Sequence, residues 1–490
     1  MTANVDNCDV VVVGGGNTAL LSAISASENG AKTLLLEKAP QGLRGGNGYF
    51  VSGGYGIPHA GMKEIMEFMP DLTEEERALD IPPYTPDEWY NHFMRITEGM
   101  TDPELLQVVA ENANKTLRWI KGLGIEFELI TISLFRDEKG RLKSVHRSPF
   151  QAKGGGAALS DKLYSFAEQR GVEVLYKTKA TRLLVDSRGR VNGMTVRQGE
   201  EVRDIKAKAV ILACGGFESN PEWRARYLGK NWDLAKVRGT RFNTGDGLKM
   251  ALEIGAQPVG HWGGCHAPFI DADAPQPAIR EQTDSTARFS YLYGVVVNVD
   301  GRRFLDEGQA LAHYTYAKYG QHVLNQPQRI AFQLFDAKVR HLLEDRYVTA
   351  TCITADSIED LAEELGIEPE ALTGEIEKFN EATTETPFDF SREDGKHTTG
   401  ITPPKTNWAQ RLDSPPYYAY EIACGISFTF GGLKISRHGQ VLDTEDEIIP
   451  GLYASGEIIG GIFYNNYIGG SGQLVGAVFG RAAGAHAASF

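Results

Sequence analysis

Residues 9–37 read DVVVVGGGNTALLSAISASENGAKTLLLE, and this stretch decides the fold. The run of valines predicts a buried β-strand, and the glycine turn at 14–16 leads into a helix-compatible stretch that stops at Asn29-Gly30. A second apolar run, 33–36, ends at the acidic residue Glu37, about 20 positions after the turn. Strand, turn, helix, strand and acid together predict a dinucleotide-binding unit with the pattern G-x-G-x-x-A.

Each part of this unit has a physical role. Gly14 forms the tight turn, and Gly16 lets backbone amides approach a pyrophosphate. The N-terminus of the helix, which starts with Asn17 and Ala19, directs its positive dipole end at the phosphates. The Glu37 carboxylate accepts hydrogen bonds from ribose hydroxyls. A glycine turn without a ligand is the alternative, but it would not require all five features in register.

Composition limits the other possibilities. The 490 residues suggest two to four domains, and 42% hydrophobic residues allow a large core. The net charge of −14 argues against a surface for nucleic acid or for an anionic membrane. No apolar run reaches the ~20 residues of a membrane span, and the first residues lack the pattern of a secretory signal. The five scattered cysteines show no zinc or haem spacing, so we expect no metal site and a cytoplasmic location.

The order of the predicted elements indicates a domain built from both ends of the chain. A helical region near 85–123 and β-runs within 172–196 precede a buried strand at 207–213. Between 261 and 384 the pattern changes to a hairpin at 295–305, a strand at 330–335 and two acidic amphipathic helices within 357–382. Strand and glycine-loop character returns at 452–457, and a final helix runs from Gly472 to about residue 487.

We therefore expect an α/β fold in which a Rossmann-like nucleotide-binding domain carries an inserted α+β domain. The predicted boundaries are 1–260 and 396–490 for the nucleotide-binding domain and 261–395 for a substrate-binding or capping domain. A ligand at the interface of two such domains is a common arrangement.

Two further glycine clusters predict a long, flat cofactor. Residues 44–54 read RGGNGYFVSGG, where paired glycines allow the backbone to lie against a ligand. Residues 453–457 read YASGE, and residues 466–473 read NYIGGSGQ at the start of the final helix. If a flavin pyrimidine edge lies before that helix, the helix dipole stabilises the anionic reduced flavin.

As a set, these motifs resemble the fumarate reductase/succinate dehydrogenase flavoprotein superfamily, and most of all its soluble branch with tricarballylate dehydrogenases and 3-ketosteroid Δ1-dehydrogenases. The resemblance covers nearly the whole chain and includes the motifs ILACGGF, NTGDG, GVVVNVDGRRFLDE, FTFGGLKI, PGLYASGE and NYIGGSGQLVGAVFGRAAG. It implies FAD as the cofactor. Covalently flavinylated members carry a linking His in the segment that matches 45–54, where this chain has Asn47, so we expect non-covalent FAD. The residues expected to contact FAD are Gly14, Gly16, Asn17, Ala19, Glu37, Lys38, Arg44, Gly45, Gly46, Asn47, Gly53, Gly54, Ala180, Ala213, Gly215, Asp246, Glu457, Ser471, Gly472 and Gln473.

The resemblance also implies the chemistry. Fumarate reductases place a proton-donating arginine and a carboxylate-binding arginine at the positions of Tyr316 and Tyr467, and a histidine at the position of Phe428. These aromatic replacements weaken a dicarboxylate site and resemble the ketosteroid dehydrogenases. By that resemblance, Tyr316 is the base, while Tyr467 and the Gly472 amide polarise a carbonyl. Because a free phenol has a pKa near ~10, Tyr316 needs help from neighbouring groups.

The alternative for the YTYAKY segment around Tyr316 is a packed aromatic strand or helix edge. For the adjacent Cys265 and His266, a nucleophile–base pair is disfavoured. The expected substrate pocket consists of Tyr49, Phe50, Tyr55, His266, Arg288 and Phe428.

The leading hypothesis is an FAD-dependent dehydrogenase (desaturase) that forms a C=C bond α,β to a carbonyl, on a small cyclic ketone or keto acid. The alternatives are a tricarballylate-type polycarboxylate dehydrogenase, an enoate reductase with an external electron donor, a subunit of a quinone-linked complex, and an FAD-binding module without catalysis. The expected partners are a small-molecule substrate and an external electron acceptor, which is oxygen, a quinone or a redox protein.

Overall fold

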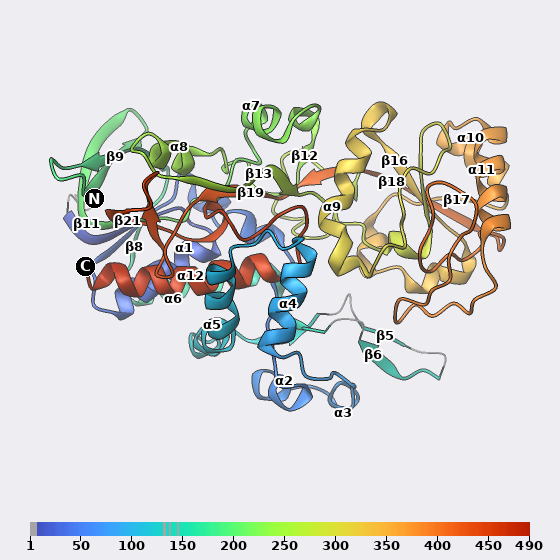
Figure 1. The fold of residues 1–490 in the computed structure, drawn as a ribbon, viewed down its shortest axis with the longest axis horizontal. Coiled ribbons are helices and arrows are strands. Elements are labelled where there is room, and N and C mark those ends of the chain that lie inside the picture. The colour runs from blue at the N-terminus through green and yellow to red at the C-terminus, as the bar shows by residue number, and fades with distance from the viewer. Residues whose placement is uncertain (1–6, 131–133, 137–138, 145–146) are drawn as a thin grey trace.

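The structure, a computed structural model, describes residues 7–130, 134–136, 139–144 and 147–490. Two main sheets lie along the long axis of the molecule, and both ends of the chain lie at the larger sheet (Figure 1). The predicted α/β architecture is confirmed.

The helices are α1 (Asn17–Glu28), α2 (Met62–Phe68), α3 (Glu74–Arg77), α4 (Pro86–Ile96), α5 (Pro103–Gly122), α6 (Gly155–Gln169), α7 (Pro221–Trp223), α8 (Asp246–Leu252), α9 (Ala312–Leu324), α10 (Ile358–Leu365), α11 (Pro369–Ala382) and α12 (Ser471–Ala488). The strands are β1 (Asn7–Val13), β2 (Thr33–Leu36), β3 (Gly54–Tyr55), β4 (Phe127–Leu129), β5 (Leu134–Arg136), β6 (Leu142–Ser144), β7 (Phe150–Ala152), β8 (Glu173–Leu175), β9 (Thr178–Val185), β10 (Val191–Gln198), β11 (Glu201–Leu212), β12 (Lys236–Val237), β13 (Pro258–His266), β14 (Phe269–Asp271), β15 (Val295–Asn298), β16 (Ala331–Phe335), β17 (Ile353–Ala355), β18 (Tyr417–Ile426), β19 (Phe428–Leu433), β20 (Gln440–Leu442) and β21 (Ile448–Ala454).

Five parallel strands form the centre of the large sheet in the order β8-β2-β1-β11-β21. The valines of β1 are buried on both faces, as expected for a central parallel strand. Because β1, β2 and β11 end in register at Val13, their following loops open at one edge of the sheet. Gly14, Glu37 and Ala213, which directly follow these strands, therefore meet at the carboxyl edge, where ligands of such sheets bind.

The C-terminal helix α12 packs along α1 because glycines remove the side chains between them. A Cβ atom on Gly476 would lie 2.2 Å from Thr18 Oγ1, and one on Gly484 would lie 2.3 Å from the Ser22 carbonyl oxygen. This pairing also shows that the two helices run in the same direction. Their N-termini therefore approach each other, and the Asn17 side chain donates to Gln473 Oε1 at 3.5 Å.

The second sheet contains β12, β14, β15, β16, β17 and β18. Its long strand β18 pairs with four of the others, yet it comes from residues beyond 395, and β12 comes from residues before 261. Both strands lie outside the boundaries 261–395 that the sequence predicted for the inserted domain. The sheet includes them because strands pair in space and do not have to be neighbours along the chain. We therefore propose that the inserted domain also includes β12 and β18.

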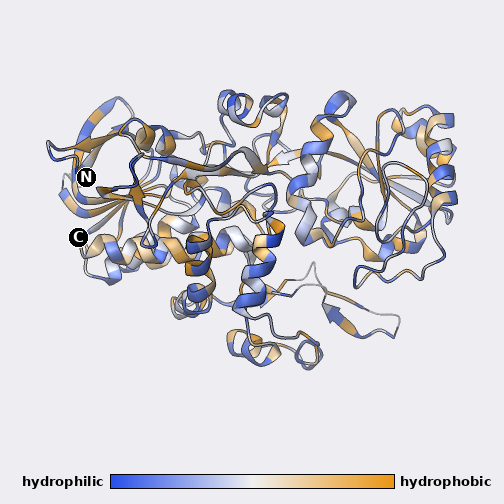
Figure 2. Cartoon of the chain, in the orientation of Figure 1, coloured by the Kyte–Doolittle hydropathy of each residue, from blue (hydrophilic) through white to orange (hydrophobic). Residues whose placement is uncertain are grey.

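Helices cover both faces of this second sheet. The apolar sides of α10 and α11 pack on one face through residues that include Leu361, Leu372 and Phe379. On the other face, α9 packs through Tyr319 and Val323. In Figure 2, α10 and α11 carry both hydrophilic and hydrophobic residues, as expected for helices that pack on the sheet with one side only. The two acidic amphipathic helices expected within 357–382 are confirmed.

The helical region expected near 85–123 is confirmed as two helices, α4 and α5, because positive φ angles at Glu98 and Gly99 turn the chain and Asp102 caps the second helix. One local prediction needs correction. The second arm of the expected hairpin at 295–305 is a single bridge, Val297 with Arg303. Arg303 instead turns its guanidinium inward to Glu307 and to the carbonyl of Pro403.

Candidate active site

A cavity of about 730 Å³ runs from the carboxyl edge of the large sheet to the region between the two sheets. Of the expected cofactor residues, those that line it are Gly14, Gly16, Asn17, Glu37, Lys38, Gly46, Asn47, Gly54, Ala180, Ala213, Gly215, Asp246, Glu457, Gly472 and Gln473. Of the expected catalytic and substrate residues, it reaches Tyr316, Tyr467, His266 and Phe428. The structure thus brings the two sets of residues into one continuous space.

The glycine turn after β1 lies at one end of the cavity. Gly14 has a φ of +112°, and a Cβ atom there would lie 2.4 Å from the Ala213 carbonyl oxygen. A Cβ atom on Gly15 would lie 2.3 Å from Glu37 Oε2 and 2.2 Å from the Tyr164 hydroxyl. Only glycine fits such a close approach, so the turn leaves room for a ligand beside the N-terminus of α1.

The acidic residue after β2 is ready to accept from a ribose. Glu37 is buried and its Oε1 accepts from the backbone N–H of Ala39 at 2.7 Å. Burial raises the pKa of Glu37 to about 7. Nearby, Asp246 Oδ2 contacts Lys38 Nζ at 2.6 Å and Asp246 Oδ1 contacts Lys179 Nζ at 2.7 Å, so the charges at this end are paired.

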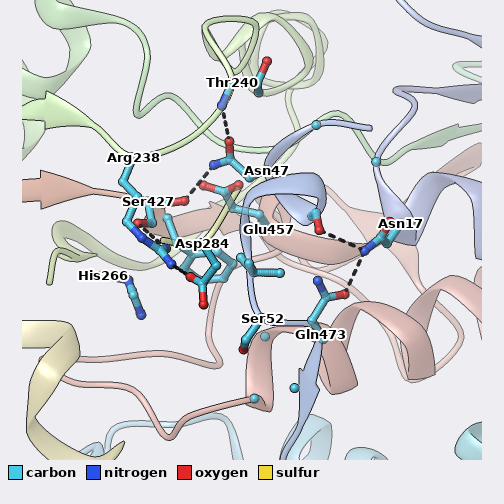
Figure 3. Close-up of a pocket in the computed structure, with 18 of the residues that line it drawn as sticks. Asn17, Asn47, Ser52, Arg238, Thr240, His266, Asp284, Ser427, Glu457 and Gln473 are labelled. Atoms are coloured by element: carbon cyan, nitrogen blue, oxygen red, sulfur yellow. Dashed lines mark hydrogen bonds and ion pairs between the residues drawn. The ribbon is translucent and has the colours of Figure 1, made fainter. Parts of the chain in front are cut away.

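Asn47 is locked in place at the middle of the cavity (Figure 3). Its Nδ2 donates to the Ser427 carbonyl oxygen at 2.7 Å and to Glu218, and its Oδ1 accepts from the backbone N–H of Thr240 at 2.8 Å. The side chain therefore joins three separate segments through hydrogen bonds. An amide held in this way offers no nucleophile for a covalent bond to a cofactor.

Two buried carboxyl groups lie beside Asn47. Glu218 and Glu457 are bridged by Asn243, whose Nδ2 donates to Glu218 Oε1 at 2.6 Å and to Glu457 Oε2 at 3.4 Å. Burial raises the pKa of both carboxyl groups, and the proximity of Glu457 raises that of Glu218 further. Glu457 also accepts from the backbone N–H of Thr429 at 2.8 Å. Ionising both carboxyl groups in one buried site is unfavourable, which is why the pKa of each is raised.

At the far end, aromatic side chains surround His266. Its ring lies edge-on to Tyr316, with ring centroids 5.0 Å apart, and to Tyr467, with centroids 4.7 Å apart. Phe289 packs against Tyr316 at 4.5 Å, and Phe428 packs near Tyr467 at 6.1 Å. Tyr316 lies on α9, so the aromatic segment around it forms a helix. Tyr316 and Tyr467 both line this end of the cavity.

Burial shifts the pKa values of these three groups away from neutrality. Burial lowers the pKa of His266 to about 3, with a smaller contribution from Arg238, so its imidazole is neutral. Burial raises the pKa of Tyr316 well above that of a free phenol. Arg238 and Arg346 act in the opposite direction on Tyr316. The pKa of Tyr467 is also raised by burial, while the hydrogen bond from Gly472 lowers it.

The Gly472 amide is engaged differently from the sequence-based prediction. Its N–H donates to the Tyr467 hydroxyl oxygen at 3.0 Å. The amide therefore acts on the phenol, and the Tyr467 hydroxyl proton is directed elsewhere. The Gly472 amide is thus bonded to Tyr467, whereas the prediction had the amide and the phenol both donate to a substrate carbonyl.

Charged residues that the sequence did not point to lie at the same end. Asp284 is paired with both Arg238 and Arg346, and Arg346 Nη1 also contacts Glu344 Oε2 at 3.0 Å. All four residues line the cavity. No short motif contains them, since they come from three distant segments, although Arg238 precedes the NTGDG motif by only a few residues.

Several expected site residues do not line the cavity. Tyr55 is fully buried in the core, Arg288 is buried and paired with Asp271, and Tyr49 lies beneath the Arg280 guanidinium at 3.4 Å. The others that the cavity lining of the described chain does not include are Ala19, Arg44, Gly45, Phe50, Gly53 and Ser471. Most of them lie near the sequence motifs but are buried in the protein, whereas Arg44 and Tyr49 are half-buried.

These features fit FAD. The glycine cradle and Glu37 suit the adenosine and pyrophosphate, and the cavity continues past Asn47 and Glu457 to the start of α12, which suits the longer flavin part of the molecule. A dinucleotide-binding fold whose cavity continues to a group of phenols is consistent with a flavoprotein oxidoreductase.

Comparison with known proteins identifies the family. Residues 9–474 match the family described as FAD binding domain, and the chain belongs to it. The protein is an FAD-dependent oxidoreductase. It is 29% identical over 489 residues to a fumarate reductase (cytochrome) of Shewanella frigidimarina, covering 99% of this chain and 78% of that protein. It is 26% identical to a 3-oxosteroid 1-dehydrogenase of Mycobacterium tuberculosis, covering 99% of both.

A solved structure supports the fold. The chain superposes on 3-ketosteroid Δ1-dehydrogenase from Sterolibacterium denitrificans with a TM-score of 0.74 at 21% identity, covering 99% of this chain and 100% of that chain. The resemblance inferred from the sequence motifs, to both branches of the superfamily, is confirmed.

Proposed function

We propose that this protein is an FAD-dependent dehydrogenase that introduces a C=C bond α,β to a carbonyl, on a cyclic ketone or keto acid. The observation that carries the proposal is the pair of phenols, Tyr316 and Tyr467, on either side of a neutral His266 at one end of the FAD cavity. The tyrosines, His266 and FAD together supply a base, a hydrogen-bond donor and an electron acceptor around one small space.

Removal of two hydrogens from adjacent carbons breaks two C–H bonds and leaves one new π bond. FAD, when bound, accepts the hydride and so takes up both electrons. The proton from the carbon next to the carbonyl goes to Tyr316. Among the described residues no hydrogen bond engages the Tyr316 hydroxyl, so it is available to a ligand. Arg238 and Arg346 favour its phenolate form.

Tyr467 polarises the substrate carbonyl. Its oxygen accepts from the Gly472 N–H, so its own proton is free to be donated to a carbonyl oxygen. The enolate that develops as Tyr316 removes the proton places negative charge on that oxygen. A donor that is held in place before the reaction stabilises this charge without reorganisation. The hydrogen bond from α12 also makes the Tyr467 hydroxyl a stronger donor, since such chains polarise one another.

His266 supports this arrangement as a neutral wall. With a pKa of about 3, it neither donates a charge nor competes for the proton. Its ring holds the two tyrosine rings apart, with their centroids 6.2 Å from each other. A substrate ring bound at this end of the cavity would lie beside both phenols.

Similarity to the fumarate reductase supports a second candidate, the reverse reaction, in which an enoate is reduced. In that case Tyr316 supplies the proton and the electrons come from an external donor. In the proposed direction the electrons pass to oxygen, a quinone or a redox protein. No helix in the described part of the chain is long and apolar enough to cross a membrane.

Anaerobic mixing of the FAD-loaded protein with substrates tests the proposal. We expect cyclic ketones and cyclic keto acids to bleach the oxidised flavin absorbance, and tricarballylate to leave it unchanged. A panel in which no ketone bleaches the flavin contradicts the proposal. If enoates instead reoxidise flavin that a reduced carrier has reduced, faster than any ketone reduces it, the second candidate replaces the first.

A further inference from the structure

Arg238 occupies an unusual electrostatic position at the substrate end of the cavity. Its Nη1 donates to Ser427 Oγ at 3.2 Å, and its Nη2 contacts Asp284. Figure 3 shows the side chain reaching toward both partners near His266. The guanidinium is only 6% exposed, and it lines the cavity.

The other guanidinium of this cluster is better neutralised than Arg238. Arg346 contacts two carboxylates, Asp284 through Nη2 and Glu344 through Nη1. Arg238 has one carboxylate partner among the described residues, Asp284, and it shares that group with Arg346. The four side chains are formally neutral together, but Arg346 contacts both carboxylates whereas Arg238 contacts only the one that it shares.

Arg238 also has a donor without an acceptor. Its Nε is buried, and no described residue accepts a hydrogen bond from it. Leaving a buried charged donor unpaired is unfavourable, and native proteins seldom do so without a function. The side chain also lines the cavity, so an anionic ligand bound there would lie against this guanidinium.

We propose that the substrate carries a carboxylate group and that Arg238 binds it, so that the preferred substrates are cyclic keto acids and not neutral ketones. This proposal rests on the proposed function. Tyr467 would hold the ketone oxygen, and Arg238 would hold the carboxylate on another part of the same molecule. A guanidinium suits this role because its planar donors match the two oxygens of a carboxylate.

The pairing within the cluster favours a ligand with a single negative charge. Arg346 already contacts two carboxylates, so Arg238, which has only the shared Asp284, is the cation that a ligand would meet. A phosphate dianion or a polycarboxylate would need a second free cation. The surrounding walls, Phe289 and Phe428, are apolar and suit the hydrocarbon ring between the ketone and the acid.

Arg238 has another possible role, because it also favours the phenolate of Tyr316. The two roles differ in their dependence on the substrate. An effect on Tyr316 changes the rate for acidic and neutral ketones alike, whereas binding of a carboxylate changes only the rate for the acid. Matched substrates therefore separate the roles.

The experiment compares 4-oxocyclohexanecarboxylate with its primary amide, in the FAD-loaded wild-type protein and in R238Q and R238K. Flavin reduction gives kcat/KM for each pair. We expect the wild type to prefer the acid. In R238Q the acid-to-amide ratio of kcat/KM should fall about 10- to 100-fold, which is the usual effect of losing a hydrogen bond to a charged group. R238K, which keeps the charge but not the planar fork, should retain an intermediate preference. R241Q, at an exposed arginine in the same loop, is the matched control and should behave as wild type.

A binding measurement gives a readout that does not depend on turnover. Cyclohexanecarboxylate has no ketone, and we expect calorimetry to show that it binds the FAD-loaded wild type and R241Q, and binds R238Q at least about 10-fold more weakly. Equal losses for acid and amide in R238Q, or unchanged binding of cyclohexanecarboxylate, overturn the carboxylate site while leaving the proposed function intact. Arg238-dependent binding of cyclohexanecarboxylate, together with no flavin reduction by any ketone, supports the site and contradicts the proposed function. If R238Q does not fold, R238K and the acid-to-amide ratio decide the question.

Discussion

The backbone N–H of Gly472 donates a hydrogen bond of 3.0 Å to the phenol oxygen of Tyr467. The bond joins the N-terminus of the last helix of the chain to a side chain five residues earlier, so both are fixed by the packing of α12 along α1. A dipole and an amide are thereby directed at one hydroxyl group. The hydroxyl proton of Tyr467 is not used in this bond and can be donated to a ligand, which suits a carbonyl oxygen that gains negative charge.

Replacement of Tyr467 by Phe tests this role. The variant keeps the ring contacts with His266 and Phe463 but removes the donor. We expect the rate of flavin reduction by a ketone to fall about 10²- to 10³-fold, as when one oxyanion donor is lost. Stopped-flow absorbance under anaerobic conditions measures the rate. Tyr464→Phe, in the same segment but away from the cavity lining, is the control, and equal losses in both variants would contradict the assignment.

Asp284 lies close enough to Tyr316 to influence the pH dependence expected of the reaction. Burial is the main cause of the raised pKa of Tyr316, and the Asp284 carboxylate raises it further, whereas Arg238 and Arg346 lower it. A base must lose its proton before it acts, so we expect the rate to rise with pH in the wild type. Asp284→Asn should move this rise to lower pH.

The rate of flavin reduction between pH 6 and pH 10 would show the shift, with the exposed Asp273→Asn as control. A profile that moves to higher pH in Asp284→Asn would contradict the electrostatic account.

His266 makes the fold sensitive to acid. Its pKa is about 3 in the folded protein because of burial, whereas an unfolded histidine titrates near its ordinary value of 6.5. The unfolded chain therefore binds a proton between these pH values that the folded chain does not. The stabilising contribution of the neutral ring is present above pH 6.5 and is lost as the pH falls toward 3.

At pH 5 the loss relative to pH 7 amounts to about 2 kcal/mol. We expect His266→Gln to remove this part of the pH dependence, measured by denaturant unfolding at both pH values. His397→Gln, at an exposed site, should keep the wild-type dependence. If the difference between pH 5 and pH 7 is the same in His266→Gln and wild type, the histidine is not buried in the neutral form.

Asn47 is expected to be structural and not a site of covalent attachment. Asn47→Ala removes hydrogen bonds to Glu218, Ser427 and Thr240. At about 1 kcal/mol each, the free energy of unfolding should fall by about 2–4 kcal/mol. Asn29→Ala, which removes one bond at an exposed helix end, should cost less than about 1 kcal/mol. In the wild type, denaturation should release all FAD into solution, and flavin that stays with the chain would contradict non-covalent binding.

The sequence predicts the nucleotide-binding half well because its signals are local. The turn at Gly14, the acid at Glu37 and the start of α12 are set by glycines and strand ends within a few residues of each other, and the structure places all of them on one cavity. The family and the cofactor follow from the same motifs.

The sequence predicts the substrate end less well, for two physical reasons. Arg238, Asp284 and Arg346 come from distant segments that only the tertiary fold brings together, so no spacing reveals them. Conversely, Tyr55 and Arg288 are near informative motifs but turn into the core, since burial depends on packing and not on position in a motif. The place of β12 and β18 in the second sheet was also not predicted, because these strands come from segments that are distant in sequence.

The central claim is that Tyr316 removes the proton next to the carbonyl. Its most direct test is the rate of flavin reduction by a cyclic keto acid and by the same compound with deuterium at the α-carbons, for wild type and Tyr316→Phe. Tyr314→Phe, on the same helix, is the control. We expect a primary isotope effect in the wild type and in Tyr314→Phe, and a rate about 10²- to 10⁴-fold lower in Tyr316→Phe. A Tyr316→Phe protein that holds FAD and reduces it at the wild-type rate would contradict the account.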